Sequence, residues 1–438
     1  MTPGKQVQST GLLTKFARGA GAALTVQLIS ACILYAAQVW LARWLGTSAY
    51  GVYEYATAVS IIGAFIASFG LPTVALRLVS AYRAQSDWAR LGGLINGSWR
   101  QILLSSIGMA GCGTAVWAWL QTTRDFGGYT WPLLLSIWTI PGLTLLGLQK
   151  EIIRGFQQIV LAFAPSLIGQ PLVLLGLAVG WRSQRPLTST VAMALSLTAI
   201  LLVLALQWGW FQSRLASQIR RPPHLYETGQ WWRVALPLML MGGSFMILNH
   251  TDTLMIGLLL NAQQVGIYSA ALKTAAWVPF ILMAVNAMAA PLIATLYAED
   301  DQAGLQQLVS MIARWMFYPA LAMAIAIVLF SRPILQLFGT EFIAAQGALV
   351  ALMLGQLVNV GAGSVGYLMT MTTYQNQAAR VMAVSALVNV ILNGVGIHFW
   401  GILGAAIATA LSMALWNIWL YVLVVKHLGV RPSILDTF

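Results

Sequence analysis

The sequence has few charged residues. Asp, Glu, Lys and Arg make up 8% of its 438 residues, against roughly a quarter in soluble domains. Hydrophobic residues make up 59%, and the mean hydropathy is +0.78. This composition excludes a water-soluble globular protein and predicts an integral membrane protein. The net charge of +12 does not indicate a nucleic-acid partner, because basic residues of membrane proteins gather in the short segments between apolar helices.

Cysteine and nucleotide-binding motifs are also scarce or missing. Cys32 and Cys112 are the only cysteines, and they have neither CxxC nor Cys/His spacing, so we expect no disulfide framework and no metal site. The sequence contains no GxxxxGK[ST] motif, so we expect no ATP hydrolysis and no cofactor. No loop is long enough to fold as an outer catalytic domain. We therefore expect no catalytic residues and no enzyme activity.

Long apolar runs occupy most of the chain. A membrane-spanning helix needs about 20 mostly apolar residues, and we count twelve such runs. They cover residues 20–43, 52–78, 97–120, 129–149, 158–181, 187–212, 234–259, 266–297, 306–330, 345–372, 379–399 and 402–426. Pro291 and the Gly361 to Gly366 stretch indicate kinks in the eighth and tenth runs. The sequence predicts an all-α membrane protein with about twelve transmembrane helices.

The distribution of Lys and Arg predicts the orientation. With a cytoplasmic N-terminus, seventeen of the 23 Lys and Arg residues lie at inner ends and loops, five lie at outer ends, and Lys273 lies inside a helix. This agrees with the positive-inside rule, so we predict that both termini are cytoplasmic. The basic segment 213–233 is the expected linker between an N-terminal six-helix bundle, 1–212, and a C-terminal six-helix bundle, 234–438.

A short repeat supports this division. Gly51-Val52-Tyr53 and Gly266-Ile267-Tyr268 each open the second helix of a half, and they are 215 residues apart. Because each half has an even number of helices, both begin on the same side of the membrane. The halves are then parallel repeats related by a pseudo-two-fold axis along the membrane normal, as in transporters that rock one half against the other.

Four stretches carry a resemblance to a known family. They are LARWLGTSAYGVYEYATAVS (41–60), LNHTDTLMIGLLLNAQQVGIYSAA (248–271), APLIATLYAEDDQAGLQQL (290–308) and LFGTEFIAAQGALVALMLGQLVNVGAGSVGYLMTMT (337–372). The chain resembles the polysaccharide transport family of the multidrug/oligosaccharidyl-lipid/polysaccharide exporter superfamily, which includes O-antigen and exopolysaccharide flippases.

The resemblance implies two bundles that form a V around a central cavity. It also implies outward transfer of a lipid-linked oligosaccharide, carried on undecaprenyl diphosphate, across a bacterial inner (plasma) membrane, with membrane lipids as partners. A polysaccharide polymerase and export machinery are further partners that this reading leaves open. Two alternatives stay open as well: a multidrug or cation antiporter of the same fold, in which Asp252 carries the exchanged ion, and a membrane scaffold subunit of a polysaccharide export complex.

One acidic residue interrupts a predicted span. Asp252 lies in the run 234–260, where a charge costs roughly 2.5 to 3.5 kcal/mol on insertion scales. Lys273 lies at about the same depth in the next helix, so the two are expected to form an ion pair. One alternative is a structural pair that locks the hairpin. A second is a pair that borders a cavity, where protonation of Asp252 or a substrate anion breaks it. A third is that the pair never forms. Asn249, one turn before Asp252, is expected on the same face.

Five further charged residues complete the predicted substrate or coupling-ion cavity. Arg43 and Glu54 flank the first hairpin at a shallow depth and are interpreted as an interfacial salt bridge. Arg77 and Arg100 lie at the cytoplasmic boundary, and Arg314 lies deeper. Arginine holds a diphosphate through charge-assisted hydrogen bonds, so these three are candidates for the head group. For Arg77 and Arg100 the positive-inside rule is a competing explanation.

Overall fold

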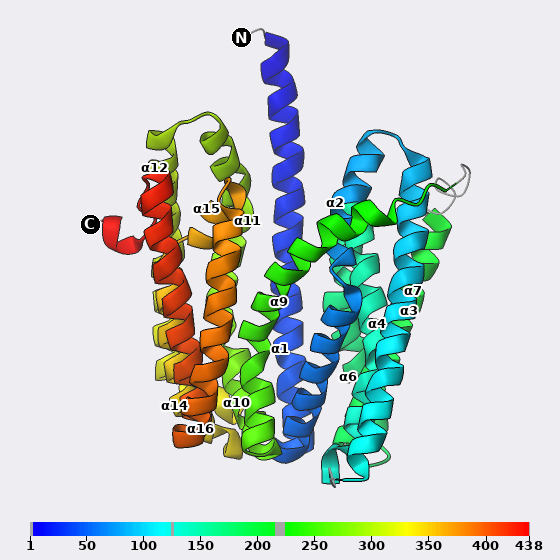
Figure 1. Ribbon diagram of the computed structural model, residues 1–438. Coiled ribbons are helices and arrows are strands. Elements are labelled where there is room, and N and C mark those ends of the chain that lie inside the picture. The colour runs from blue at the N-terminus through cyan, green and yellow to red at the C-terminus, as the bar shows by residue number, and fades with distance from the viewer. Residues whose placement is uncertain (1–2, 124–126, 215–223, 438) are drawn as a thin grey trace. The chain divides into compact units, whose positions relative to one another are not determined.

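The computed structural model describes residues 3–123, 127–214 and 224–437 (Figure 1). Within these ranges the regular elements are all helices, and ten helical segments are long and apolar enough to cross a membrane. Gln375–Leu428 contains the last two of the twelve predicted spans, and Thr25–Ser68 covers most of the first two. The second predicted span, 52–78, continues past Ser68. The all-α fold predicted from the sequence is confirmed, and each predicted span has its helical counterpart.

Each of the two long segments folds back on itself at a glycine. A straight helix over the 44 residues of Thr25–Ser68 would be roughly 65 Å long, about twice the hydrocarbon thickness of a bilayer. Helix α1 (Pro3–Ser68) instead bends at Gly46, with φ 75° and ψ 172°. Helix α16 (Gln375–Leu428) bends at Gly401, with φ 56° and ψ −135°. Residues with side chains rarely adopt these angles, so the two glycines permit the two hairpins.

The chain divides into two compact units. The first contains Met1–Gln38 and Val59–Met239, and the second contains Val39–Ala58 and Leu240–Phe438. The second unit therefore includes the bend of α1 at Gly46, which is the loop between the first two predicted spans. Of the predicted linker 213–233, residues 215–223 lie outside the described part of the chain.

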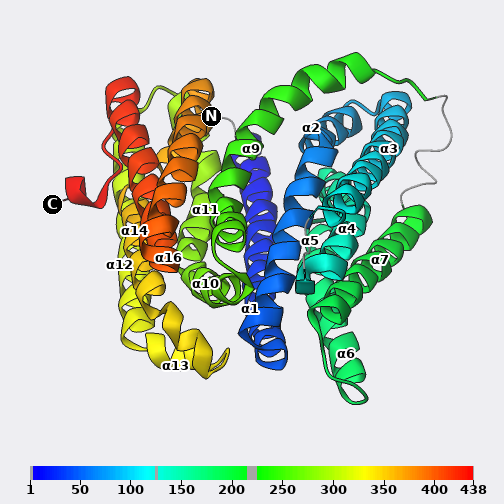
Figure 2. The ribbon, with the colours of Figure 1, turned by 60° about the horizontal axis from the view of Figure 1, so that its bottom comes forward.

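In the first unit, apolar side chains of α4 pack against the helices around it. Besides parts of α1, the first unit contains α2 (Leu71–Ala84), α3 (Trp88–Gln121), α4 (Thr130–Gly155), α5 (Ile159–Ala164), α6 (Gln170–Arg182) and α7 (Ser189–Arg214). Leu148 and Ile152 of α4 share a fully buried cluster with Leu71, Val74 and Leu91 of α2 and α3. The cluster is an apolar core, and Figure 2 shows its helices side by side.

The described end of the linker is docked on α2 and α3 of this unit. The Leu225 amide donates to the Ala89 carbonyl at 3.1 Å, and Arg90 forms a 3.0 Å ion pair with Glu227. The Tyr82 hydroxyl donates to the same carboxylate at 3.2 Å, and burial together with this negative charge raises the pKa of Tyr82. These contacts join the segment just before α9 (Thr228–Leu259) to the helices of the first unit.

The second unit contains the rest of α9 and the helices that follow it. They are α9 (Thr228–Leu259), α10 (Ala262–Ala275), α11 (Trp277–Ala298), α12 (Gln302–Leu329), α13 (Ser331–Gln336), α14 (Gln346–Gly361), α15 (Val365–Met371) and α16. The predicted break in the tenth run is present, between α14 and α15, where Gly363 has φ 80°. The eighth run is interrupted at Ala276, between α10 and α11, and α11 continues through Pro291. Pro279, three residues after Ala276, lacks the amide hydrogen that would continue α10 across the break.

The two Gly-apolar-Tyr repeats contact each other directly. A Cβ atom added to Gly51 would lie 1.7 Å from the Ala262 carbonyl oxygen, and one added to Gly266 would lie 2.1 Å from the Thr47 carbonyl oxygen. The contact is reciprocal, as expected for two copies near a two-fold axis. The glycines are therefore required for close approach of the two backbones.

Candidate functional site

Asp252 is held by three neutral donors from two other helices. Tyr268 of α10 donates to Asp252 Oδ2 at 2.5 Å, and Thr409 of α16 donates to the same oxygen at 2.8 Å. Asn393 Nδ2 of α16 donates to Asp252 Oδ1 at 3.3 Å. Asp252 itself is 1% exposed. Hydrogen bonds thus replace water around a carboxylate that lies inside the protein.

The bend of α16 brings the donors of its two arms together. Asn393 lies before Gly401 and Thr409 lies after it, and a Cβ atom on Gly404 would lie 1.8 Å from the Gly396 carbonyl oxygen. This close packing of the arms places both side chains against Asp252. Asn393 Oδ1 is buried without a hydrogen-bond partner. The Asp252 carboxylate, the Thr409 hydroxyl and Asn393 Oδ1 are hard oxygen ligands, a set suited to a small cation.

Lys273 pairs with Glu54 and not with Asp252. Its ammonium lies 3.2 Å from Glu54 Oε2, and the side chains are 32% and 7% exposed. The expected Asp252–Lys273 pair is therefore wrong. Similar depth on neighbouring helices does not make two side chains face each other, and Asp252 faces Tyr268 and α16.

The expected Arg43–Glu54 pair is wrong as well. The Arg43 guanidinium donates to the Leu337 carbonyl beyond α13, while Glu54 bonds to Lys273. Close by, Thr47 donates to Glu341 Oε2 at 2.6 Å. The segment 39–58 of the first predicted bundle thus makes polar contacts with residues of the second. We call these contacts, Arg43–Leu337, Thr47–Glu341 and Glu54–Lys273, the hairpin clasp.

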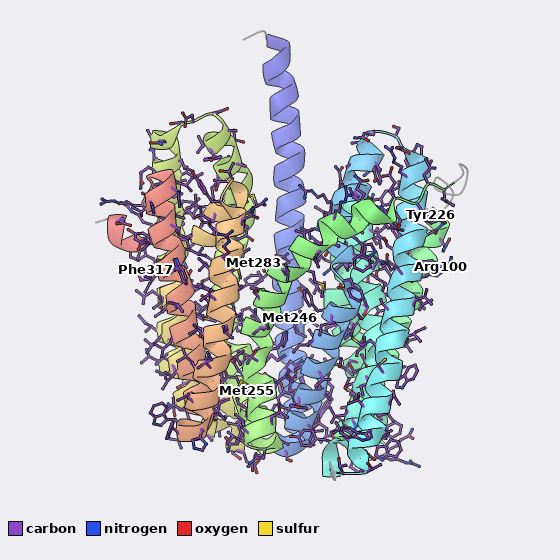
Figure 3. The ribbon with its side chains drawn as sticks, in the orientation of Figure 1. Arg100, Tyr226, Met246, Met255, Met283 and Phe317 are labelled. Atoms are coloured by element: carbon purple, nitrogen blue, oxygen red, sulfur yellow. The ribbon has the colours of Figure 1, made fainter. Side chains whose placement is uncertain are left out.

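None of the other predicted site residues is among the side chains that donate hydrogen bonds to Asp252. Asn249 is exposed, and its amide donates to the Phe245 carbonyl of its own helix at 2.7 Å. Arg314 is exposed on α12 in the second unit. Arg77 on α2 and Arg100 on α3 (Figure 3) are exposed residues of the first unit. A cavity formed by all eight residues therefore stays a prediction.

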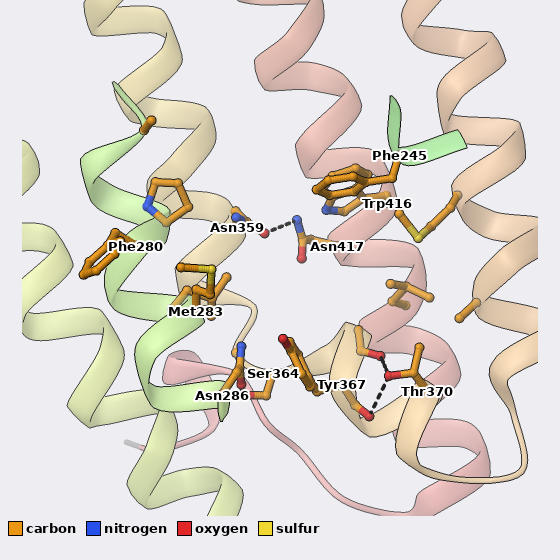
Figure 4. Close-up of a pocket in the computed structure, with 18 residues that line it drawn as sticks. Phe245, Phe280, Met283, Asn286, Asn359, Ser364, Tyr367, Thr370, Trp416 and Asn417 are labelled. Carbon is orange, nitrogen blue, oxygen red and sulfur yellow. Dashed lines mark hydrogen bonds between the residues drawn. The ribbon is translucent and has the colours of Figure 1, made fainter. Parts of the chain in front are cut away.

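The second unit contains a cavity of about 590 Å³ that the sequence reading missed (Figure 4). This volume lies within the range of about 300 to 1,000 Å³ that is typical of small-molecule sites. The lining includes four aromatic residues, namely Phe245, Phe280, Tyr367 and Trp416. None of its eighteen residues is Asp, Glu, Lys, Arg or His. Asp252 and Lys273 do not line it.

Polar side chains in this cavity are fixed by bonds to each other. Ser364 donates to Asn286 Oδ1 at 2.5 Å, and Asn417 Nδ2 donates to Asn359 Oδ1 at 3.0 Å. The break between α14 and α15 places Ser364 at the cavity, and α16 contributes Asn417. An amide side chain inside an apolar span was a sequence signal for this cavity, as it was for the contact of Asn393 with Asp252.

These features define a multi-pass membrane protein with a transporter fold. A family model described as "Polysaccharide biosynthesis protein" matches residues 16–297, and a model described as MatE matches residues 237–395. The first covers more than half of the chain. The chain therefore belongs to the polysaccharide biosynthesis protein family, within the superfamily that the sequence resembles.

One curated relative is a probable low-salt glycan biosynthesis flippase, Agl15, from Haloferax volcanii. It is 28% identical over 223 residues, which is 49% of this chain and 45% of the relative. The match thus spans a little under half of that relative's length.

Two solved structures share the fold. An inward-facing multidrug resistance MATE family transporter aligns with a TM-score of 0.77 at 11% identity, covering 94% of this chain and 98% of that one. The lipid II flippase MurJ in an inward closed conformation aligns with a TM-score of 0.65 at 13% identity, covering 92% and 87%. The fold is thus common to drug transporters and to a lipid flippase.

Proposed function

We propose that this protein is a flippase that moves a lipid-linked oligosaccharide, or a related polysaccharide precursor, from the cytoplasmic to the outer leaflet of a bacterial inner membrane. It works by alternating access, without catalytic chemistry, and both of its termini are cytoplasmic. The family match and the glycan flippase relative support this class of substrate. The observation that carries the proposal is the cavity in the second unit, which lacks Asp, Glu, Lys, Arg and His.

An uncharged wall supports the flippase over a cation antiporter. A cationic drug in a low-dielectric cavity needs an acidic side chain or several fixed dipoles to replace its hydration. Asp252, the acidic residue of the antiporter alternative, has a buried carboxylate that already accepts three hydrogen bonds. A glycan has no such need, because neutral amides and hydroxyls bond to its hydroxyl groups.

In this account Asp252 is the site of coupling to an ion. Entry of a proton or a small cation at Asp252 changes which of Tyr268, Asn393 and Thr409 remain bonded to it. Because Asn393 and Thr409 lie on the two arms of α16, this would alter the packing of the arms. An ion that binds one packing better than the other biases the equilibrium between access states.

The diphosphate of the carrier is assigned to arginines. Arg314, Arg77 and Arg100 are the candidates, since they are exposed and their guanidinium groups can bind phosphate oxygens in a bidentate manner. The hairpin clasp would break as the protein opens to the outer face. Its three contacts join segments from the two predicted halves, which an outward-open state must separate.

Deletion of the gene in its own host tests the proposal. We expect lipid-linked oligosaccharide to accumulate on the cytoplasmic face, where a membrane-impermeant glycan label added outside does not reach it. Restoring the gene on a plasmid should return the labelled glycolipid to the outer leaflet. Unchanged glycolipid together with raised drug sensitivity would instead support the antiporter.

A further inference from the structure

Three neutral polar side chains project into the cavity of the second unit. Asn286 is oriented by Ser364, which donates to its carbonyl oxygen at 2.5 Å, so that its amide nitrogen points into the cavity (Figure 4). Asn417 is oriented by its bonds to Asn359 and to the Met413 carbonyl, and its own carbonyl oxygen faces the cavity. The Tyr367 hydroxyl also points inward. The cavity thus offers a fixed donor, a fixed acceptor and a hydroxyl that can serve as either.

Aromatic rings form the apolar part of the same wall. Trp416 of α16, Phe280 of α11 and Tyr367 of α15 come from three different helices (Figure 4). Flat rings beside oriented amides suit a ligand that is apolar on its faces and polar around its edge. The C–H groups of a pyranose ring pack on an aromatic face, while its hydroxyls extend outward to hydrogen-bonding groups.

Two other parts of a lipid-linked glycan fit this cavity less well. A polyprenyl chain would leave the Asn286 amide and the Asn417 carbonyl without hydrogen-bond partners, which is unfavourable for buried polar groups. A diphosphate would find neither Lys nor Arg among the lining residues to balance its charge. A neutral sugar ring satisfies the amides and needs no counter-charge.

We propose that this cavity is a subsite for a neutral sugar ring of the transported glycan. The ring stacks on Trp416, and Asn286 and Asn417 bond to its hydroxyls. The inference rests on the proposed function and adds to it the chemical nature of one part of the substrate. Ser364 is a positioning residue, because it bonds to Asn286 and fixes the direction of its amide.

Equilibrium binding to the full-length protein in nanodiscs tests the subsite. The two probes are a short-chain polyprenyl diphosphate that carries one N-acetylhexosamine and the same polyprenyl diphosphate without a sugar. The ratio of their dissociation constants isolates the contribution of the sugar. We expect the wild type to bind the sugar-bearing probe at least about tenfold more tightly. Trp416→Leu and Asn286→Leu should bring this ratio close to one.

Two matched variants and the sugar-free probe serve as controls. Trp416→Phe keeps an aromatic face and should retain most of the preference. Trp419→Leu changes an exposed tryptophan three residues along the same helix and should leave the ratio unchanged. An unaltered dissociation constant for the sugar-free probe shows that each variant is folded. If Trp416→Leu or Asn286→Leu no longer binds the sugar-free probe, the other of these two variants provides the test.

Two results overturn the subsite: a ratio near one in the wild type, or a wild-type ratio in both Trp416→Leu and Asn286→Leu. Failure of the proposed function is measured separately, as the absence of glycolipid translocation in vesicles. A wild type that prefers the sugar but does not translocate it contradicts the flippase and keeps the subsite. A wild type that translocates both probes equally and shows no preference keeps the flippase and contradicts the subsite.

Discussion

The Lys273 ammonium lies 3.2 Å from Glu54 Oε2, although the two residues belong to different sequence repeats. Glu54 directly follows the first Gly-apolar-Tyr copy, and Lys273 lies five residues after the second. The two glycines of these copies bring the backbones together. The ion pair and the glycine contact therefore form one junction between the repeats.

Removing Lys273 should destabilise this junction. Lys273→Met leaves the Glu54 carboxylate, 7% exposed, without its counter-charge. We expect a loss of about 1 to 3 kcal/mol, less than for a fully buried pair because Lys273 is partly exposed. Thermal melting of the detergent-solubilised protein measures it. The exchanged variant, Glu54→Lys with Lys273→Glu, should recover most of the loss, and a melting temperature unchanged by Lys273→Met would show that the pair contributes nothing.

Adding a methyl group at the repeat contact should be more damaging than elsewhere. In Gly266→Ala the new Cβ atom would meet the Thr47 carbonyl oxygen, so we expect destabilisation by about 1 to 3 kcal/mol or loss of the folded protein. The matched control is Gly108→Ala on α3, where a Cβ atom meets nothing within 4 Å. Alanine favours a helix over glycine, so this control should melt at the wild-type temperature or slightly higher. Equal melting of the two variants would refute the close contact.

Asp252 should be needed for coupling more than for folding. Asp252→Asn keeps the size and an acceptor oxygen at the centre of the cluster, so we expect a melting temperature close to that of the wild type and loss of any stimulation of transport by Na⁺ or by a pH gradient. Tyr268→Phe removes one donor to the carboxylate and should cost about 1 to 3 kcal/mol. A variant Asp252→Asn with normal ion stimulation would remove the coupling role.

Ser364 should affect substrate discrimination through Asn286. Ser364→Ala removes the hydrogen bond that orients the amide, so the side chain can turn its oxygen toward the ligand. We expect a several-fold weaker preference for the sugar-bearing probe, with unchanged binding of the sugar-free one. Ser433→Ala, which removes a hydroxyl bonded to the Gly361 carbonyl outside the cavity lining, is the control. A preference unaffected by Ser364→Ala would show that Asn286 is held by other contacts.

The helices could be predicted from the sequence better than the site could. Apolar run length alone located the spans, because a bilayer imposes that length on every helix. The repeat could be recognised in the sequence from Gly51 and Gly266. Because glycine has no side chain, the two backbones can approach closely at these positions. The partner of Asp252 was not predictable, since helix rotation decides which side chains face each other, and depth gives no information about rotation.

The first repeat shows the same limit. At the 215-residue offset, Ala37 takes the place of Asp252, so the first half offers no matching carboxylate from which a partner could be inferred. The cavity around Asn286 depends on breaks in two spans. The sequence indicated the break at Gly361 to Gly366 but not the interruption at Ala276. An interruption of this kind changes which residues face the cavity.

Translocation by the purified protein in proteoliposomes tests the central claim most directly. Vesicles contain a fluorescent polyprenyl-diphosphate glycolipid, and a membrane-impermeant quencher measures its appearance in the outer leaflet. The same preparation is loaded with a cationic dye to measure antiport. We predict protein-dependent glycolipid translocation, slowed by Trp416→Leu but not by Trp419→Leu, and no dye movement above empty vesicles. Dye transport driven by a proton or sodium gradient, with no glycolipid translocation, would contradict the account.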